Sequence, residues 1–312
     1  MRIGIDLGGT NISAAIVDEG GGIVKRISIP TNASGDAETV TGGLLRVCDM
    51  LIGKTGEMPH SIGVGIPGTI NVETGEVVFT PNLPLNGINV VDEIRRVYDC
   101  PVHIGNDANC AALGEAVAGC AKDVRNVVLI TLGTGVGGGI ISDGKLHSGL
   151  SGAAGELGHM VIMAGGRECG CGRRGCWEAY ASATGIIRTA NEFLQPHNKS
   201  LLWELCGGIT ERINGRMIFD AYRAEDGIAR LVVETYINHL ATGIANIINI
   251  LEPDMICVGG GISNAWDCME APLKAAVDAE KYTSHSHGVP MTRIVQAQLG
   301  NDAGIVGAAM LC

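Results

Sequence analysis

Residues 2–17 read RIGIDLGGTNISAAIV, and residues 127–142 read VVLITLGTGVGGGIIS. Each stretch is an apolar run, a glycine-rich turn and a second apolar run, which is the pattern of two strands joined by a tight turn. At a constant offset of 125 positions, residues in and next to the first region recur in and next to the second, among them Leu7 as Leu132, Gly8 as Gly133, Ile16 as Ile141 and Asp18 as Asp143. This predicts an internal repeat on the scale of a domain. Chance similarity between two glycine-rich hairpins is the alternative.

Helices and strands alternate around the repeat. Apolar residues at helical spacing predict helices over Thr39–Leu51, Val90–Tyr98, Ala108–Ala118, Ile228–Leu251 and Ala303–Leu311. Short apolar runs predict strands over Arg2–Asp6, Ile12–Val17, Ile23–Ile29, Val102–Ile104, Val127–Thr131, Val136–Ser142 and Met255–Val258. In the longest helix we expect one broad apolar face that includes Leu231 and Leu251. The alternation favours an α/β protein with largely parallel sheets and helices outside them.

Composition excludes several classes of protein. With 46% hydrophobic and 18% charged residues, the 312-residue chain can bury a large core and is not globally disordered. A net charge of −11 without a concentrated basic patch argues against nucleic acid as a partner. No segment reads as an export signal or a membrane span, since the longest uncharged apolar run, Thr235–Leu251, contains several polar residues. Eleven cysteines then predict reduced thiols in a cytoplasmic protein, some of them holding a metal.

Three glycine-rich turns follow apolar strands, at Asp6–Thr10, Leu132–Gly139 and Gly259–Ser263. Glycine lets backbone N–H groups approach an anion closely, and Thr10 and Thr134 add hydroxyl donors. None of the turns matches a P-loop or a dinucleotide-binding fingerprint. Together they favour a site for nucleotide phosphates between two lobes, although tight hairpins also use glycine. Asp6 is a candidate to hold Mg²⁺ through water, or else a residue that caps the turn.

A cluster of metal-ligand residues lies in the middle of the chain: His159, Cys169, Cys171 and Cys176. Three thiolates and an imidazole make a closed tetrahedral zinc site, which is structural rather than catalytic. Gly170, Gly172 and Gly175 allow tight turns between the ligands. Scattered reduced cysteines are the alternative. We expect the metal to fix the loop that carries these residues.

Two carboxylates flank this cluster. Glu156 lies three residues before His159, and Glu178 lies two residues after Cys176. A carboxylate accepts hydrogen bonds from neighbouring hydroxyls, so a metal-fixed loop with two of them suits a polyhydroxylated ligand. The second ring nitrogen of His159 could also reach that ligand. Each glutamate could instead be a solvated loop residue.

The pair Asn106 and Asp107 lies between a predicted strand and a predicted helix. This is the usual place for site residues in open α/β sheets. Asp107 fits a general base that takes the proton from an attacking hydroxyl during phosphoryl transfer, or a residue that caps the helix. Asn82 and the turn that ends at Gly68 are expected to be loops of the same lobe, and Asn82 is a candidate to bind a hydroxyl.

Five motifs together resemble those of the ROK family of sugar kinases and repressors: DLGGT at 6–10, GNDAN at 105–109, LGTGVGGG at 132–139, ELGH at 156–159 and CGCGRRGCWE at 169–178. The resemblance extends from Gly4 to the end of the chain, and the run 176–185 is especially similar to bacterial glucokinases of this family. It implies an actin-like fold (hexokinase-like, ribonuclease H-like) with a ligand cleft between two lobes. The small lobe would span 1–118, completed by the C-terminal helix 302–312, and the large lobe 119–301.

The resemblance also implies an activity, the phosphorylation of a hexose at its 6-hydroxyl by ATP with Mg²⁺. Asp107 would be the catalytic base. The sugar would be bound by Gly68, Asn82, Asn106, Asp107, Glu156, His159 and Glu178. The nucleotide would be bound by Asp6, Gly8, Gly9, Thr10, Asn11, Thr134, Gly135, Gly137, Gly260 and Gly261. A structural Zn²⁺ would be held by His159, Cys169, Cys171 and Cys176.

Alternatives exist within the resemblance. Repressors of the family carry an N-terminal winged-helix extension, whereas the first motif here starts at Gly4, so we expect an enzyme. Glucose is the favoured substrate, and an N-acetylhexosamine (N-acetylmannosamine or N-acetylglucosamine) is the second choice, with mannose, allose and fructose also open. The phosphate donor could differ from ATP. We further expect a homo-oligomer (dimer or tetramer) that serves carbohydrate metabolism, in glycolysis, in the cytoplasm.

Overall fold

The computed structural model describes residues 1–195, 199–285 and 290–311. Contacts divide the chain into two compact units. The first unit consists of Met1–Leu129, Gly138–Gly155 and Ala297–Cys312, and the second of Ile130–Gly137 and Glu156–Gln296. The lobe boundaries expected from the sequence stay a prediction, and Cys312, the last residue of the expected helix 302–312, lies outside the described residues.

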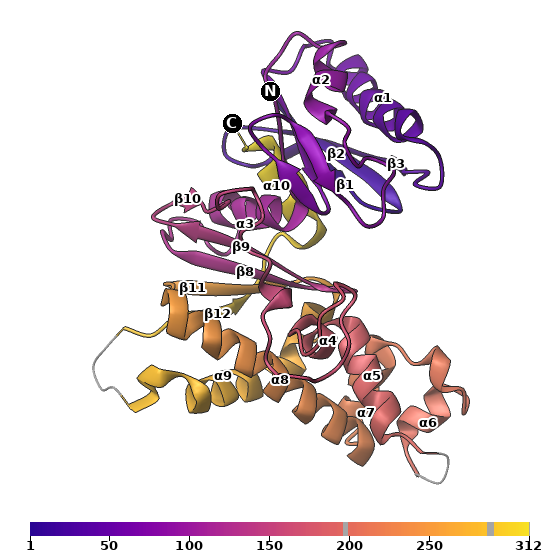
Figure 1. The fold of residues 1–312 in the computed structure, drawn as a ribbon, viewed down its shortest axis with the longest axis vertical. Helices are drawn as coiled ribbons and strands as arrows, with labels where there is room; N and C mark the ends of the chain where they lie inside the picture. The colour runs from indigo at the N-terminus through magenta and orange to yellow at the C-terminus, as the bar shows by residue number, and fades with distance from the viewer. Residues whose placement is uncertain (196–198, 286–289, 312) are drawn as a thin grey trace. The chain divides into compact units, whose positions relative to one another are not determined.

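The first unit contains a five-stranded sheet in the order β3-β2-β1-β4-β7 (Figure 1). Its strands are β1 (Arg2–Leu7), β2 (Asn11–Val17), β3 (Ile23–Pro30), β4 (Ser61–Ile66) and β7 (Val102–Asn106). The pairs β1–β2 and β2–β3 are antiparallel, whereas β1–β4 and β4–β7 are parallel. β5 (Thr69–Asn71) and β6 (Glu76–Phe79) form a separate small sheet that the sequence analysis did not anticipate.

Helices cover both faces of this first sheet. Side chains alternate across a strand, so Ile3 and Ile5 point to one face and pack in the core with α1 (Ala37–Thr55) and α2 (Val90–Arg95). Gly4 points to the other face, where α10 (Ala303–Ala309) lies so close that a Cβ at Gly4 would be 2.0 Å from a backbone oxygen of that helix. The absence of a side chain at Gly4 therefore lets the C-terminal helix rest on the N-terminal strand.

A second five-stranded sheet has the order β10-β9-β8-β11-β12. Its strands are β8 (Val127–Leu132), β9 (Val136–Ser142), β10 (Lys145–Leu146), β11 (Met255–Gly259) and β12 (Arg293–Gln296). In both sheets the strand that comes first in the sequence lies in the middle. The second and third strands extend the sheet on one side of it, and the fourth and fifth strands extend it on the other side. The expected internal repeat is therefore confirmed at the level of topology, and chance similarity of two hairpins does not account for it.

The expectation of largely parallel sheets was wrong, because both sheets are mixed. β10 pairs with β9 in antiparallel fashion, and β11 pairs with β12 in parallel. Each sheet begins with consecutive strands joined by turns of a few residues, and such short connections permit only antiparallel neighbours. The parallel pairs β1–β4, β4–β7 and β11–β12 instead join strands that are separated in the sequence by at least one helix.

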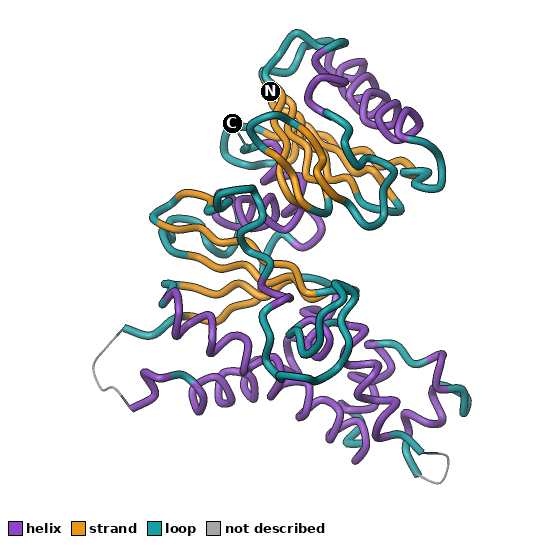
Figure 2. Tube along the Cα trace, in the orientation of Figure 1, coloured by secondary structure: helices purple, strands orange, loops and turns teal. Residues whose placement is uncertain are grey.

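The second unit is rich in helices, as Figure 2 shows. They are α4 (Glu178–Ala181), α5 (Ala183–Phe193), α6 (Leu201–Leu205), α7 (Gly215–Arg223), α8 (Gly227–Leu251) and α9 (Trp266–Glu280), together with the 3₁₀ turns η1 (Leu157–His159), η2 (Thr210–Arg212), η3 (Gly261–Ala265) and η4 (Tyr282–His285). In the first unit, α3 (Asp107–Ala118) and η5 (Gly300–Asp302) complete the set. All five predicted helices and all seven predicted strands are present. No helix within the described ranges is long and apolar enough to cross a membrane.

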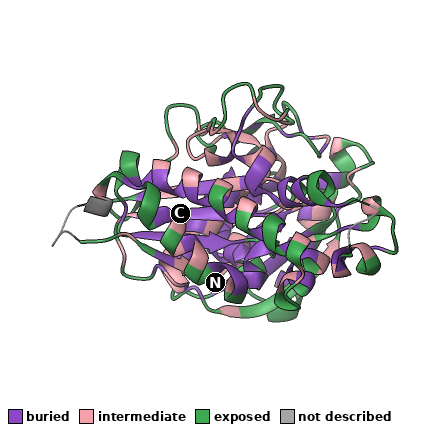
Figure 3. Cartoon of the chain, turned by 90° about the horizontal axis from the view of Figure 1, so that it is seen from below, coloured by how far each residue is buried: buried purple, intermediate pink, exposed green. Residues whose placement is uncertain are grey.

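The central helix α8 buries most of its predicted apolar face but not all of it. Tyr236, Leu240 and Ile244 are fully buried, whereas Leu231 and Leu251 are 47% and 43% exposed. Leu231 lies one position, about 100° of rotation, from buried Val232 and so falls at the edge of the packed face. Figure 3 shows the same division across the chain, with buried strands and exposed outer faces of helices.

Candidate active site

Asp107 is placed at a strand-to-helix junction, as the sequence predicted. β7 ends at Asn106, and α3 begins at Asp107. The helix is capped by Asn106, whose Oδ1 accepts from the backbone N–H groups of Ala108 (2.9 Å) and Asn109 (3.1 Å). The capping role that was the alternative for Asp107 therefore belongs to its neighbour. The half-buried Asp107 carboxylate accepts a bond from the N–H of Ala108, at 2.9 Å.

The pKa of the Asp107 carboxyl is raised by burial, although the hydrogen bond from Ala108 works in the opposite direction. Asp6 lies near it at the end of β1, and its pKa is raised to about 6 by burial and by the negative charge of Asp107, with Arg26 opposing. No hydrogen bond to the Asp6 carboxylate is found within 1–195, 199–285 and 290–311, so it does not cap the turn. The structure thus brings two carboxyls with raised pKa values together in the first unit.

The other first-unit candidates for sugar binding lie around this pair. The Nδ2 of Asn106 donates to the carbonyl of Gly68 at 3.0 Å. Gly68 has a φ of 115°, and a Cβ there would be 2.1 Å from the backbone oxygen of Phe79, so the position requires glycine. Asn82 is exposed, and its Cβ is 3.8 Å from where a Cβ of Gly9 would lie. Asn82 is therefore adjacent to the first glycine-rich turn.

That first turn is short and exposed at its tip. The N–H of Gly8 donates to the carbonyl of Asn11 at 2.9 Å, and the hydroxyl of Thr31 donates to the carbonyl of Gly8 at 2.6 Å. Gly9, Thr10 and Asn11 are exposed. Hydrogen bonds hold the carbonyls of Gly8 and Asn11 in place. The exposed residues at the tip of the turn can therefore contact a ligand.

In the second unit, the four predicted metal ligands converge. Their ligand atoms, on His159, Cys169, Cys171 and Cys176, all lie within 4.8 Å of one another. The Nδ1 of His159 is 3.6 Å from the Sγ of Cys169, and the Sγ atoms of Cys171 and Cys176 are 3.7 Å apart. Gly172 and Gly175 between them have φ values of 84° and 83°, as tight turns require.

Glu178 stands beside this cluster at the start of α4. Its Oε1 is 3.5 Å from the Sγ of Cys169. Its Oε2 accepts from the backbone N–H of Val136 at 3.0 Å, which ties it to the second glycine-rich turn. Trp177, fully buried, donates from its Nε1 to the carbonyl of His239 at 2.9 Å and so holds the start of α4 on α8. The contact between Glu178 and Val136 was not predicted, because nothing in the sequence relates two positions 42 residues apart.

The remaining second-unit candidates are Glu156, Thr134, Gly135, Gly137, Gly260 and Gly261. Glu156 is exposed and precedes η1, and its carbonyl accepts from the N–H of His159 at 3.1 Å. The carbonyl of Thr134 accepts from the hydroxyl of Thr184 at 3.0 Å. Gly260, with a φ of 83°, lies directly on the end of β8, since a Cβ there would be 2.5 Å from the backbone N and O of Leu132. The second and third glycine-rich turns therefore meet.

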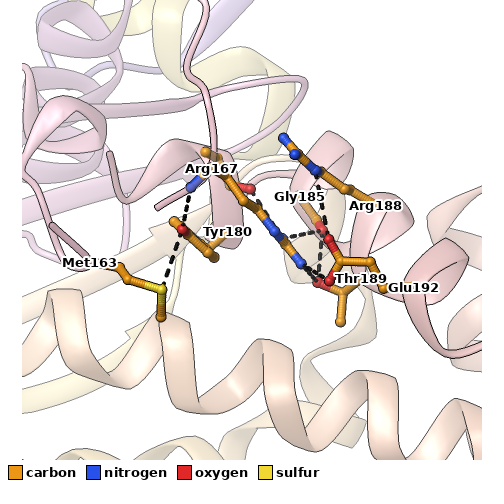
Figure 4. A network of polar contacts seen from close by, with 8 residues as sticks. Met163, Arg167, Tyr180, Gly185, Arg188, Thr189 and Glu192 are labelled. Carbon is orange, nitrogen blue, oxygen red and sulfur yellow. Dashed lines mark hydrogen bonds and ion pairs between the residues drawn. The ribbon is translucent and has the colours of Figure 1, made fainter. Parts of the chain in front are cut away.

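Arg167 is a well-connected residue that the sequence analysis missed. Its guanidinium donates to the carbonyls of Ala179 and Gly185, to the hydroxyl of Thr189 and, at 2.6 Å, to the carboxylate of Glu192 (Figure 4). It also lies over the ring of Tyr180, 4.8 Å from the centroid, while its backbone N–H donates to the hydroxyl of that tyrosine. Arg167 thereby fastens the loop that leads to Cys169 onto α4 and α5. Its only sequence signal was its place two residues before a cysteine.

The chain belongs to the ROK family, whose model matches residues 2–312. Among known proteins it is similar to a glucokinase of Halalkalibacterium halodurans (38% identity, covering 99% of this chain and 94% of the relative). It is also similar to a glucokinase of Thermotoga maritima (37% identity, covering 99% and 96%). The crystal structure of a ROK family glucokinase from Streptomyces griseus in complex with glucose and AMPPNP matches with a TM-score of 0.84 and 33% identity, covering 100% of this chain and 98% of that one. The expected family and its actin-like, hexokinase-like fold are thus confirmed.

Proposed function

We propose that this protein is a glucokinase, which transfers the γ-phosphoryl group of ATP to the 6-hydroxyl of glucose. The observation that carries the proposal is the similarity, over the whole chain, to a ROK glucokinase that holds glucose and AMPPNP. The positions of the carboxylates and glycine-rich turns in this chain agree with that chemistry.

Asp107 would be the general base. Its carboxylate must be ionised to take the proton from the 6-hydroxyl, and burial moves its pKa toward the working pH, where a base is most effective. Because the phosphoryl group passes through a loose transition state, the protein contributes mainly by positioning and by electrostatic stabilisation. The rigid junction of β7 and α3, fixed by the Asn106 cap, supplies that positioning.

Each unit carries hydroxyl-recognising groups that are candidates to bind the sugar. In the first unit these are Asn82, Asn106 and the backbone at Gly68, with Asn106 offering the amide hydrogen that Gly68 does not use. In the second unit they are Glu156, Glu178 and His159, whose Nδ1 faces Cys169 and whose Nε2 can donate to a hydroxyl.

The nucleotide phosphates would be bound by the glycine-rich turns. The first contributes Gly8, Gly9, Thr10 and Asn11, the second Thr134, Gly135 and Gly137, and the third Gly260 and Gly261. Asp6 has no hydrogen-bond partner among the described residues, which leaves its carboxylate available to hold a hydrated Mg²⁺. Bound Mg²⁺ would neutralise charge on the β- and γ-phosphates. The ionised carboxylate of Asp6 would supply the negative charge that holds the Mg²⁺ in place.

Zn²⁺ fits the four-residue cluster. With Zn–S bonds of about 2.3 Å and Zn–N bonds of about 2.05 Å, the edges of a tetrahedron are about 3.75 Å between sulfurs and about 3.55 Å between sulfur and nitrogen. Two of the separations, 3.7 Å between the sulfurs of Cys171 and Cys176 and 3.6 Å between Cys169 and His159, agree with these values, and all four ligand atoms lie within 4.8 Å of one another. A closed set of three thiolates and one imidazole leaves no open position, so the ion would stabilise the loop that carries His159 and supports Glu178.

A coupled ADP-release assay tests the proposal. The purified protein is assayed with MgATP and glucose, N-acetylmannosamine, N-acetylglucosamine, mannose, fructose or allose, beside Asp107→Asn. The control is Asp92→Asn, which changes an exposed acid in the first turn of α2. We expect the highest kcat/KM with glucose, a loss of about 10²–10⁴-fold in kcat for Asp107→Asn and little change for the control.

Two results would change the proposal. If an N-acetylated sugar gave the highest kcat/KM, the chemistry would stand and the substrate would be an N-acetylhexosamine. If no sugar supported turnover in protein that contains zinc and binds AMPPNP, the protein would not be a sugar kinase.

A further inference from the structure

Glu178 joins two parts of the second unit that the proposed function treats separately. Its carboxylate is one of the sugar-binding candidates, yet its Oε2 accepts a hydrogen bond from Val136 in the second glycine-rich turn, whose residues Thr134, Gly135 and Gly137 would bind nucleotide phosphates. We propose that this hydrogen bond sets the position of the Glu178 carboxylate, and that Gly135 is a positioning residue for sugar binding because only glycine leaves room for it. The inference rests on the proposed function and adds a structural link between the two substrates.

Space is the reason for glycine at position 135. A Cβ there would lie 2.3 Å from the Oε2 of Glu178 and 3.2 Å from its Cδ. The backbone does not require glycine, because Gly135 is not among the residues with positive φ. An alanine could therefore adopt the same backbone conformation, and its methyl group would displace the carboxylate.

The backbone on both sides of the contact is held in place, so the side chain of Glu178 has to take up the displacement. Glu178 follows the buried Trp177, and its other oxygen lies 3.5 Å from the Sγ of Cys169. On the side of the turn, the carbonyl of Gly133 accepts from the N–H of Ala183 at 2.8 Å, and that of Thr134 accepts from Thr184. The turn is thus anchored to α5, and the only flexible group between the two anchors is the Glu178 side chain.

The link has a thermodynamic consequence. A hydrogen bond to an ionised carboxylate is among the stronger ones in proteins, and it orders the donor as much as the acceptor. If the turn orders Glu178 for the sugar, Glu178 must order the turn for the nucleotide by the same coupling free energy. A substitution in the turn that displaces the Glu178 carboxylate should therefore alter sugar affinity even when no nucleotide is present.

The test is the affinity for glucose, measured by titration calorimetry in buffer without nucleotide, for wild type, Gly135→Ala and Gly133→Ala. Gly133 is the matched control, because it lies in the same turn and a Cβ there meets nothing within 4 Å. We expect Gly135→Ala to raise the Kd for glucose at least about tenfold, as loss of one hydrogen bond to a charged group would. Gly133→Ala should change it less than about twofold. Thermal melts of both variants check that they fold.

A second variant tests the coupling from the other side. Glu178→Ala removes the acceptor of the Val136 N–H, and we expect it to weaken AMPPNP binding in sugar-free buffer. Equal glucose affinities for Gly135→Ala and Gly133→Ala, with AMPPNP affinity unchanged in Glu178→Ala, would overturn the inference and leave the glucokinase proposal intact. Wild-type protein that binds no glucose would overturn the proposed function itself, and the inference with it.

Discussion

We expect the pH dependence of activity to come from two residues, Asp107 and Asp6. Burial raises the pKa of Asp107, and burial together with the charge of Asp107 raises that of Asp6 to about 6. Both carboxyls act in their ionised form in the proposed mechanism. We therefore expect kcat/KM for glucose to fall as the pH is lowered through about 6, well above the range near 4 where an unperturbed aspartate titrates.

The measurement is a pH profile of kcat/KM between pH 5 and 9 in buffers of constant ionic strength. Because the two carboxyls interact, the acid limb gives apparent pKa values that belong to the pair. Asp107→Asn should remove one titrating group and change the shape of the limb, not only its height. A profile that stays flat to about pH 5 would show that neither carboxyl has a raised pKa in the working enzyme.

At the residue scale, the sequence predicts groups that lie next to a recognisable local signal. Asp107 follows an apolar run and precedes a helical pattern, so its junction could be predicted, and the ligand types of the cysteine cluster identify it without geometry. The bond from Val136 to Glu178 could not be predicted, because it depends on how α4 is placed against a hairpin far away in the sequence. Which of Asn106 and Asp107 caps α3 could not be predicted either, because both residue types are good helix N-caps.

At the scale of elements, Arg167 decides how the loop that carries the proposed zinc ligands is attached to helices α4 and α5. Its side chain is 10% exposed and binds two carbonyls, one hydroxyl and one carboxylate. Arg167→Met keeps the length of the side chain but removes the donor of all these bonds, although the carbonyl of Gly185 keeps another donor, the hydroxyl of Thr189. We expect a loss of about 2–4 kcal/mol in the free energy of unfolding and faster release of zinc to a chelator.

Arg174→Met is the control for this prediction. Arg174 lies in the same loop and pairs with Glu168, but the two side chains are 54% and 76% exposed, so the pair contributes less than about 1 kcal/mol. Chemical denaturation gives the free energies, and a colorimetric zinc indicator gives the release rates. Similar results for the two variants would mean that the metal alone holds the loop.

Helices with a strongly periodic pattern of apolar residues could be predicted from the sequence, whereas the elements that pack beside them could not. α8 could be located from its apolar spacing, but the exposure of Leu231 depends on which helices pack beside it. The mixed character of the sheets follows from the short connections between consecutive strands, which force antiparallel pairing, whereas the alternation of helices and strands alone indicates parallel sheets. The small β5–β6 sheet has strands of three and four residues, too short for a periodic signal.

At the scale of the whole molecule, the two ends of the chain fold together in the first unit. α10 lies on β1 and against α3, the helix that carries Asp107. The approach depends on Gly307, where a Cβ would be 1.6 Å from the backbone oxygen of Cys110 and 2.8 Å from the backbone nitrogen of Gly114. Backbone atoms on the facing helix cannot move aside as a flexible side chain could, so a methyl group here must push α10 away from α3.

Gly307→Ala should therefore destabilise the protein by about 2–4 kcal/mol through overpacking, even though alanine favours helices. Gly42→Ala makes the same substitution within α1, where a Cβ meets nothing within 4 Å, and should stabilise it by up to about 1 kcal/mol. Equilibrium unfolding of both variants measures the sign of each change in the free energy of unfolding. Because α3 holds the proposed base, Gly307→Ala should also lower kcat, whereas Gly42→Ala should leave it unchanged. Stabilisation by both substitutions would mean that the C-terminal helix does not press on α3 as closely as its backbone contacts indicate.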